Sequence, residues 1–448
     1  KKPSFKIKYI DASWADLLSS SDSRTIINTY RQSLEIYQTS KAHLALATLA
    51  DNCVISLVNN FEQNSKESFQ NQAKQQQQQT KTTIFPQNQP NQQQNQKNQP
   101  NQQQPNPNVN RAILSNEVRK NSLFWTGRNL NKETPQVLLE FLPLALLNYM
   151  QAMIISPEYS YEIVPRILVL MFDVGRYMIP VRTGGSENDI FRIVSSNFKS
   201  RILTKMKEAI ESNMNKVKSS IWVNSITQLI SRIEQPVELL STLYGFIIIA
   251  LKDYPQVVFW NLMSIKRTKE RQEHFTALWR KFESESSESQ VRMKWINELQ
   301  VRYDMVIGQL IGLIQYRISP KDGIKFIKCS SIAPALLEAF KDSDMIVPLS
   351  STLTVDYSNQ NPEIYSKTTP RIIGIEDNVN VIRSQQCPKR ITVKTSSGSQ
   401  CHYLIKKDND LRKDMRMMEF GSFINRLLNR DKRSRQKALS LKTYAVIC

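Results

Sequence analysis

The residues best suited to chemistry lie near the end of the chain, where a lysine follows a short apolar stretch and is followed by two aspartates. Lys406 ends the stretch Cys401–Ile405, and Asp410 and Asp414 come soon after it. A lysine at a strand end can reach the α- and β-phosphates of a nucleotide as a point charge. It then needs a carboxylate partner, and Asp414, near the start of a helix, would also complement the helix dipole. The spacing predicts a phosphate site.

A small polar turn precedes this lysine-bearing strand. Pro388–Lys394 alternates like a strand, Thr395–Ser399 is rich in hydroxyl groups, and Cys401–Ile405 runs back. The tip of such a hairpin can lay backbone N–H groups and a serine against phosphate oxygens. Ser396 and Ser397 are therefore candidate phosphate ligands. A Ser-Ser-Gly turn alone is more often an ordinary hairpin, so it is the order of the elements that favours a nucleotide site.

A helix and a second strand are expected after the hairpin. Asp410 can cap the helix. The apolar residues of this helix lie roughly on one side and are Met415, Met418, Ile424, Leu427 and Leu428. Leu439–Ile447 then alternates as a strand, with Tyr444 available to line a base pocket.

Short motifs beside the predicted phosphate site are specific enough to indicate a family. Asp410–Asp414 reads Asp-Leu-Arg-Lys-Asp, and Cys387–Ile391 reads Cys-Pro-Lys-Arg-Ile. They resemble D-L-R-[QK]-D and x-P-K-[KR]-I of the phosphoinositide 3-kinase-related protein kinases. Met415–Phe420 and Thr443–Ile447 resemble the ATR-type branch in particular, and Tyr254–Gln256 looks like the end of the family's helical FAT domain. The resemblance is contiguous over 345–448 and diffuse over 111–344.

The resemblance implies roles for single residues. Lys406 would be the phosphate-binding lysine, and Ser396 and Ser397 the phosphate-loop serines. Asp414 would orient the lysine, with Asp410 as the lesser candidate. Tyr444 would line the inner wall of the adenine pocket. The implied cofactors are ATP and Mg²⁺ or Mn²⁺.

The resemblance also implies what the chain lacks. The family's catalytic loop, D-R-H-x-x-N, and its metal-binding D-F-G would lie beyond Cys448. The three histidines, His43, His274 and His402, lie outside any such motif. We therefore expect no catalytic residue and no metal ligand here, and no phosphotransfer by the chain as given.

The implied fold class is mostly α, a FAT-type α-solenoid followed by an incomplete α+β kinase small lobe. Scarce glycine, 11 of 448 residues, agrees with a helical protein. We expect a helical repeat over 1–62, in which Ile26, Ile27, Tyr30, Leu34 and Tyr37 recur at helical spacing. A disordered Gln/Asn/Pro-rich insertion is expected over 63–110, the solenoid over 111–344 and the small lobe over 345–448.

Charge and family together suggest partners. The net charge is +20, and 381–448 holds 16 Lys/Arg against 5 Asp/Glu. A basic small lobe that meets phosphates explains this excess better than direct DNA binding. The resemblance implies protein substrates, an ATRIP-like regulatory subunit, chromatin or DNA contacted indirectly through partners, no membrane, and a nuclear location in DNA-damage and replication checkpoint signalling.

Two alternatives remain open at the level of sequence. The first is another branch of the same family, the ATM or TOR branch or a lipid kinase. The second is a non-catalytic helical scaffold that binds proteins.

Overall fold

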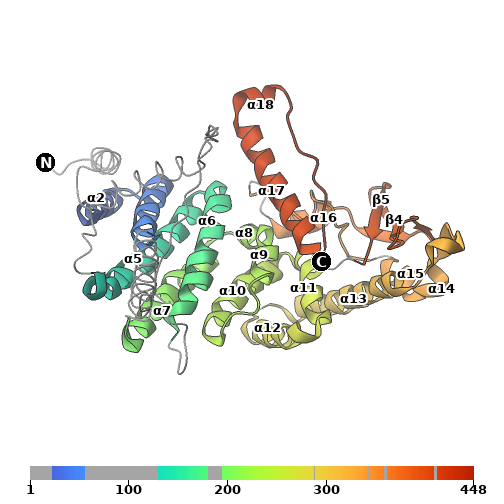
Figure 1. Ribbon diagram of the computed structural model, residues 1–448, viewed down its shortest axis with the longest axis horizontal. Helices are drawn as coiled ribbons and strands as arrows, with labels where there is room; N and C mark the ends of the chain where they lie inside the picture. Colours follow the sequence, from blue (N-terminus) through green and yellow to red (C-terminus); the bar gives the residue numbers. More distant parts are fainter. Residues whose placement is uncertain are drawn as a thin grey trace, which may run out of the picture. The chain divides into compact units, whose positions relative to one another are not determined.

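The computed structural model describes residues 23–55, 130–179, 194–286, 288–341, 343–357, 361–407 and 411–447 (Figure 1). The predicted insertion over 63–110, Asp410 and Cys448 lie outside these residues. The chain divides into two compact units. Unit 1 is Lys1–Ala152 with Tyr177–Ala209, and unit 2 is Met153–Arg176 with Ile210–Cys448.

Unit 1 contains helices and no strand in its described part. It contains α2 (Ser23–Ile36), a helix over 40–55, most of α5 (Leu130–Ile155) and most of α7 (Ser196–Glu211). The helical spacing correctly placed Ile26, Ile27, Tyr30 and Leu34 in the core. Tyr37, which continues the same spacing, is 64% exposed, because it lies just after the end of α2.

The helix α5 is long and rich in apolar residues. Among the described residues, length and composition would let one helix, Pro135–Ile155, cross a membrane, although 67% of its most apolar window is buried inside the protein. A core helix of a soluble protein passes the same test, so this observation is weak evidence for a membrane span.

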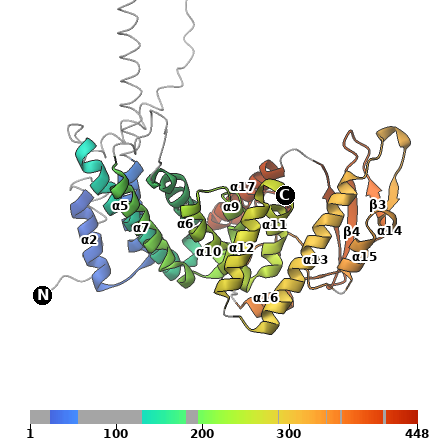
Figure 2. The ribbon, with the colours of Figure 1, turned by 90° about the horizontal axis from the view of Figure 1, so that it is seen from below.

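Unit 2 begins with helices, most of which are neighbours both in sequence and in space (Figure 2). These helices are α6 (Ser160–Leu168), α8 (Ser219–Asn224), α9 (Ile226–Ile230), α10 (Val237–Asp253), α11 (Pro255–Arg267), α12 (Gln272–Glu285) and α13 (Gln290–Gln315). Helix α11 packs against α10, α12 and α13. Successive antiparallel packing of this kind is the predicted α-solenoid.

The centre of this solenoid is formed by helices that are apolar on most sides. Eleven of the 17 residues of α10 are buried, which is typical of a helix surrounded by others. Trp222 of α8 is fully buried against Phe246 of α10, with ring centroids 4.3 Å apart. Aromatic side chains therefore fix the spacing of these helices.

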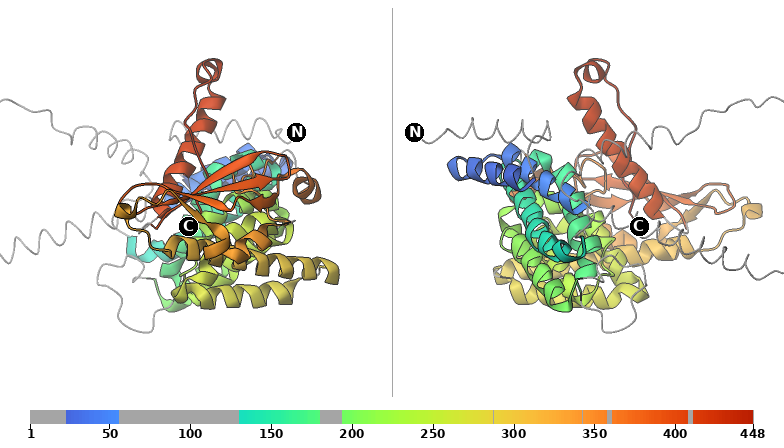
Figure 3. Two further views of the ribbon diagram at one scale, coloured as in Figure 1. Left: turned by 90° about the vertical axis from the view of Figure 1, so that its right-hand side faces the viewer. Right: turned by 60° about the vertical axis from the view of Figure 1, so that its left-hand side comes forward.

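A five-stranded antiparallel sheet follows the solenoid, and Figure 3 shows its strands beside α13 and α15. The strands are β1 (Phe326–Lys328), β2 (Ile372–Ile375), β3 (Asn378–Val381), β4 (Lys389–Thr395) and β5 (Gln400–Ile405). Strand β4 is central: β5 lines one side, and β3 and β2 share the other. Two short helices, α14 (Cys329–Ile332) and α15 (Pro334–Phe340), join this region, and α15 packs against β2 and α13.

The sheet begins earlier in the sequence than the small lobe was predicted to begin. Strand β1 pairs with β3, from Phe326 opposite Asn380 to Lys328 opposite Asn378. The solenoid and the sheet therefore overlap in sequence between β1 and the predicted boundary near 344. The domain boundaries themselves stay predictions.

Three further helices complete unit 2: α16 (Pro362–Thr368), α17 (Leu411–Arg430) and α18 (Lys432–Gln436). The predicted strand over Leu439–Ile447 is wrong, because this segment pairs with no strand among the described residues. Its Leu441 instead exchanges two backbone hydrogen bonds with the side chain of Asn425. Thr443 also lies close to Gly421, so the segment runs along α17.

Trp222→Ala tests the aromatic core. The change removes a fully buried side chain and should lower the free energy of unfolding by about 3–5 kcal/mol. Chemical denaturation followed by circular dichroism measures this loss. The control is Met417→Ala on an exposed position of α17, which should change stability by less than about 0.5 kcal/mol. Equal effects of the two changes would contradict the placement of Trp222.

Candidate functional site

The hairpin of β4 and β5 forms as the sequence predicts, and its tip holds a cluster of hydroxyl groups. Thr395 Oγ1 lies 2.8 Å from Ser397 Oγ and 2.8 Å from Ser399 Oγ. The two serine oxygens are 3.0 Å apart. Gly398 completes the turn with φ of +79°, a conformation that glycine adopts without steric cost. The run of small hydroxyl residues is therefore explained by a turn whose own side chains hydrogen-bond to one another.

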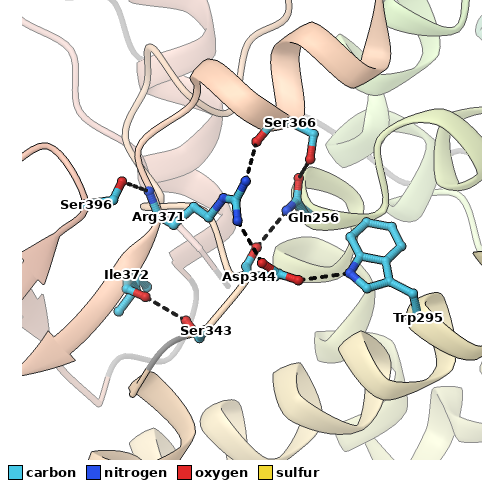
Figure 4. Close-up of polar contacts among 8 residues, drawn as sticks. All are labelled: Gln256, Trp295, Ser343, Asp344, Ser366, Arg371, Ile372 and Ser396. Atoms are coloured by element: carbon cyan, nitrogen blue, oxygen red, sulfur yellow. Dashed lines mark hydrogen bonds and ion pairs between the residues drawn. The ribbon is translucent and has the colours of Figure 1, made fainter.

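Ser396, the other predicted phosphate-loop serine, is hydrogen-bonded to the backbone of Arg371, which directly precedes β2 (Figure 4). Its hydroxyl accepts a hydrogen bond of 2.9 Å from the backbone N–H of Arg371. Its own N–H donates to the Arg371 carbonyl at 2.8 Å. Ser396 therefore joins the hairpin tip to the adjacent strand.

Lys406 and Asp414 meet as predicted. Lys406 Nζ lies 3.1 Å from Asp414 Oδ2, which joins the end of β5 to the first turn of α17. The two side chains are 29% and 44% exposed. An ion pair with this exposure contributes little to stability. The contact instead restricts where the ammonium group lies, which matters for a group that would bind phosphate.

The register of the hairpin separates the predicted serines from this lysine. Lys394 lies opposite Gln400 next to the tip, and Lys389 lies opposite Ile405 at the other end. The six residues of β5 therefore span about 20 Å between the serine tip and Lys406. Ser396 and Ser397 do not lie beside Lys406, and this placement argues against the predicted grouping.

A loop that sequence reasoning missed lies at the lysine end of the sheet. Residues 382–388 connect β3 to β4, and Lys389, directly after this loop, pairs with both Val381 and Ile405. The loop is closed by Ile382 N–H donating to the Pro388 carbonyl at 2.9 Å. Its residues 382–386 are exposed. The sequence could have indicated that this loop lies near Lys406. In an antiparallel hairpin the residues at the base, and not those at the tip, lie next to the end of the return strand.

The exposed part of this loop is able to bind an anion. It carries the guanidinium group of Arg383 and the hydroxyl of Ser384. Cys387 adopts a left-handed conformation with φ of 42°, and its N–H donates to the Ser384 carbonyl at 3.2 Å. Within the described residues, the backbone N–H groups of 384–386 donate to no protein acceptor. Such N–H groups in a tight turn form a concave surface that accepts phosphate oxygens.

The helix that carries Asp414 is attached to the solenoid of unit 2. The guanidinium carbon of Arg426 lies 3.1 Å from the ring centroid of Tyr161 in α6. Burial lowers the pKa of Arg426 to about 10, which leaves it charged at neutral pH. Glu419 accepts a hydrogen bond from Thr227 of α9. Movement of α6 or α9 would therefore move α17 and its aspartate.

The structure does not bury Tyr444. Its side chain is 60% exposed on the segment that follows α17. The predicted contact with an adenine ring depends on a strand that this structure does not contain in the described residues. Asp410, the lesser candidate beside Lys406, lies outside the described residues.

Known proteins resemble this chain in sequence over much of its length. Residues 205–299 match the family described as serine/threonine-protein kinase ATR-like, HEAT repeats. The serine/threonine-protein kinase ATR of Oryza sativa subsp. indica is 27% identical over 318 residues, covering 69% of this chain and 11% of the relative. Protein kinase rad3 of Schizosaccharomyces pombe is 26% identical over 336 residues, covering 71% of this chain and 14% of the relative. The chain thus spans a small part of the length of these relatives.

The fold is similar to a solved structure described as the FAT and kinase domain of CtTel1. The TM-score is 0.61 at 15% identity, and the match covers 99% of this chain and 27% of that chain. The predicted fold class, a helical solenoid followed by part of a kinase small lobe, is confirmed. The resemblance to ATR-type kinases is also confirmed.

Gly398→Ala tests the conformation of the hairpin tip. An added Cβ meets nothing within 4 Å, so the cost comes only from the positive φ. Thermal unfolding should show a loss of about 1 kcal/mol. The matched control is Gly374→Ala in β2, which also has open space but no positive φ. A loss of similar size in both variants would show that φ at Gly398 is not the cause.

Proposed function

We propose that this chain, an ATR-type member of the phosphoinositide 3-kinase-related kinases, supplies the part of the kinase small lobe that binds the phosphates of ATP. The observation that carries the proposal is the contact of Lys406 Nζ with Asp414 Oδ2 at 3.1 Å. It places an oriented cation at the end of the sheet where the loop 382–388 presents N–H groups and a hydroxyl. An ammonium group and free N–H donors are the groups that bind phosphate oxygens.

The roles of the residues follow from this arrangement. Lys406 would neutralise charge on the α- and β-phosphates, and Asp414 would hold its ammonium group in place. The loop 382–388 would cover the phosphates from the β3–β4 side. Phosphoryl transfer depends mainly on positioning and on electrostatic stabilisation, so these contacts are the contribution that this chain can make to the reaction.

The metal ion that such a reaction requires is not accounted for by these residues. Among the residues that the structure describes, no group of three His, Cys, Asp or Glu side chains could hold a metal ion. The described residues therefore do not fit a Mg²⁺ or Mn²⁺ site.

The activity of the whole protein is part of the proposal. We propose transfer of the γ-phosphate of ATP to serine or threonine of protein substrates, in nuclear DNA-damage and replication checkpoint signalling. The support is that the relatives are named serine/threonine-protein kinase ATR, protein kinase rad3 and serine/threonine-protein kinase MEC1. The solenoid would bind an ATRIP-like regulatory subunit, and contact with chromatin would come through such partners.

Lys406→Met in the full-length kinase tests the nucleotide site. Loss of the ammonium group should lower kcat/KM by at least about 100-fold, because it removes charge stabilisation of the transferring phosphate. Phosphorylation of a protein substrate with labelled ATP measures this. The control is Lys407→Met at the neighbouring exposed position, which should retain activity. Retained activity in Lys406→Met would favour the alternative of a non-catalytic scaffold or a nucleotide site elsewhere.

Serine substitutions test which end of the sheet binds the phosphates of ATP. Ser384→Ala should raise the KM for ATP about fivefold, the effect of losing one hydrogen bond. The double change of Ser396 and Ser397 to Ala should leave this KM unaltered, because about 20 Å separates the tip from Lys406. Steady-state kinetics at varied ATP concentration provides the comparison, and the opposite ranking would restore the serine tip as the phosphate loop.

A further inference from the structure

Lys389 is a buried lysine that is not among the residues proposed to contact the phosphates of ATP. It is the first residue of β4 and is 4% exposed. Its Nζ donates to the backbone carbonyls of Tyr316 at 2.9 Å and Ile314 at 3.4 Å. These carbonyls lie at the C-terminal end of α13, where carbonyl groups lack helical partners and the helix dipole is negative. The lysine therefore attaches the sheet to the end of a 26-residue solenoid helix.

The position of Lys389 in the sheet connects it to both parts of the proposed phosphate site. It lies directly after the loop 382–388, and its backbone pairs with Val381 on one side and with Ile405 on the other. Ile405 directly precedes Lys406. The three residues form one row across β3, β4 and β5, from which the loop and the lysine both extend. Fixing this row fixes the two groups relative to each other.

Stability alone does not account for a lysine at this position. Burial lowers the pKa of Lys389, since the charged form is poorly solvated there. The acceptors that the structure describes for it are backbone carbonyls and not a carboxylate. A methionine of similar length would fill this space without the desolvation cost of the charge. The lysine instead fixes the position of β4, because its N–H groups bind two carbonyls at the end of α13.

We propose that Lys389 is a positioning residue for ATP binding, which sets the loop 382–388 and Lys406 against each other by fixing their end of the sheet to α13. This inference rests on the proposed function. It extends that function by making the nucleotide site sensitive to the position of a solenoid helix. A partner that shifts the end of α13 would change the affinity for ATP through this contact.

A second attachment between solenoid and sheet offers a matched comparison (Figure 4). Asp344 accepts hydrogen bonds from Trp295 of α13 at 3.0 Å and from Arg371 at 2.9 Å. The backbone of Arg371 in turn holds Ser396 at the hairpin tip. This attachment involves the same helix α13 but reaches the end of the β4–β5 hairpin that lies away from Lys406.

Lys389→Met in the full-length kinase is the main test. It should raise the KM for ATP about 3- to 10-fold with little change in kcat, the range expected when coupling to a distant element is lost. Backbone hydrogen exchange should become faster over 382–388. Lys389→Arg, which retains donors for the carbonyls, should recover most of both properties. If the methionine variant does not fold, Lys389→Gln takes its place, because its shorter, uncharged side chain does not extend as far as the lysine ammonium group, and the same rise in KM is expected.

Trp295→Phe is the control, because it removes the indole N–H that Asp344 accepts and keeps an aromatic ring beside Arg292. It should speed exchange over 395–399 and leave the KM for ATP unchanged. The proposal is overturned if Lys389→Met leaves both the KM and the exchange over 382–388 at wild-type values, or if Trp295→Phe raises the KM equally. Failure of the proposed function is a different result: Lys406→Met would retain phosphotransfer, whereas exchange over 382–388 would still report whether Lys389 fixes this loop.

Discussion

The register between β4 and β5 is the constraint on which the candidate site depends. Because Lys389 pairs with Ile405, Lys406 leaves the sheet at the end where the β3–β4 loop enters it. A shift of one residue would turn every side chain of β5 to the opposite face. It would also move Lys406 away from Asp414. The hydrogen bonds of the ladder therefore determine which groups share the phosphate end of the sheet.

The small sheet is attached to the solenoid of unit 2 at several separate points. Lys389 binds the end of α13, and Asp344 joins Trp295 to Arg371. The indole N–H of Trp260 in α11 also donates to the Ile346 carbonyl at 3.0 Å, and this bond is buried. Ile346 and Asp344 both contact Arg371, just ahead of β2, whereas Lys389 lies at the other end of β4. The sheet is therefore held to α13 at two ends and to α11 at one of them.

A second connection runs from the solenoid to the site through α17. Arg426 and Glu419 hold this helix to α6 and α9, and Asp414 lies in its first turn. The lysine is therefore oriented from one side by the sheet and from the other by a helix, and each is fixed to different solenoid helices. Changes in the solenoid would reach the phosphate site by two routes, one through Lys389 and one through Asp414.

The sequence by itself determined the helical periodicity, the β4–β5 hairpin, the helix after it and the pairing of Lys406 with Asp414. These features depend on contacts between near neighbours in the chain, which spacing and residue type encode directly. Tertiary structure alone decided that Leu439–Ile447 runs along α17, because alternation predicts an extended segment but supplies no partner strand. It also decided that Lys389 is buried, because its acceptors lie more than seventy residues away at the end of α13. Contacts between residues so distant in sequence depend on packing, which no local pattern contains.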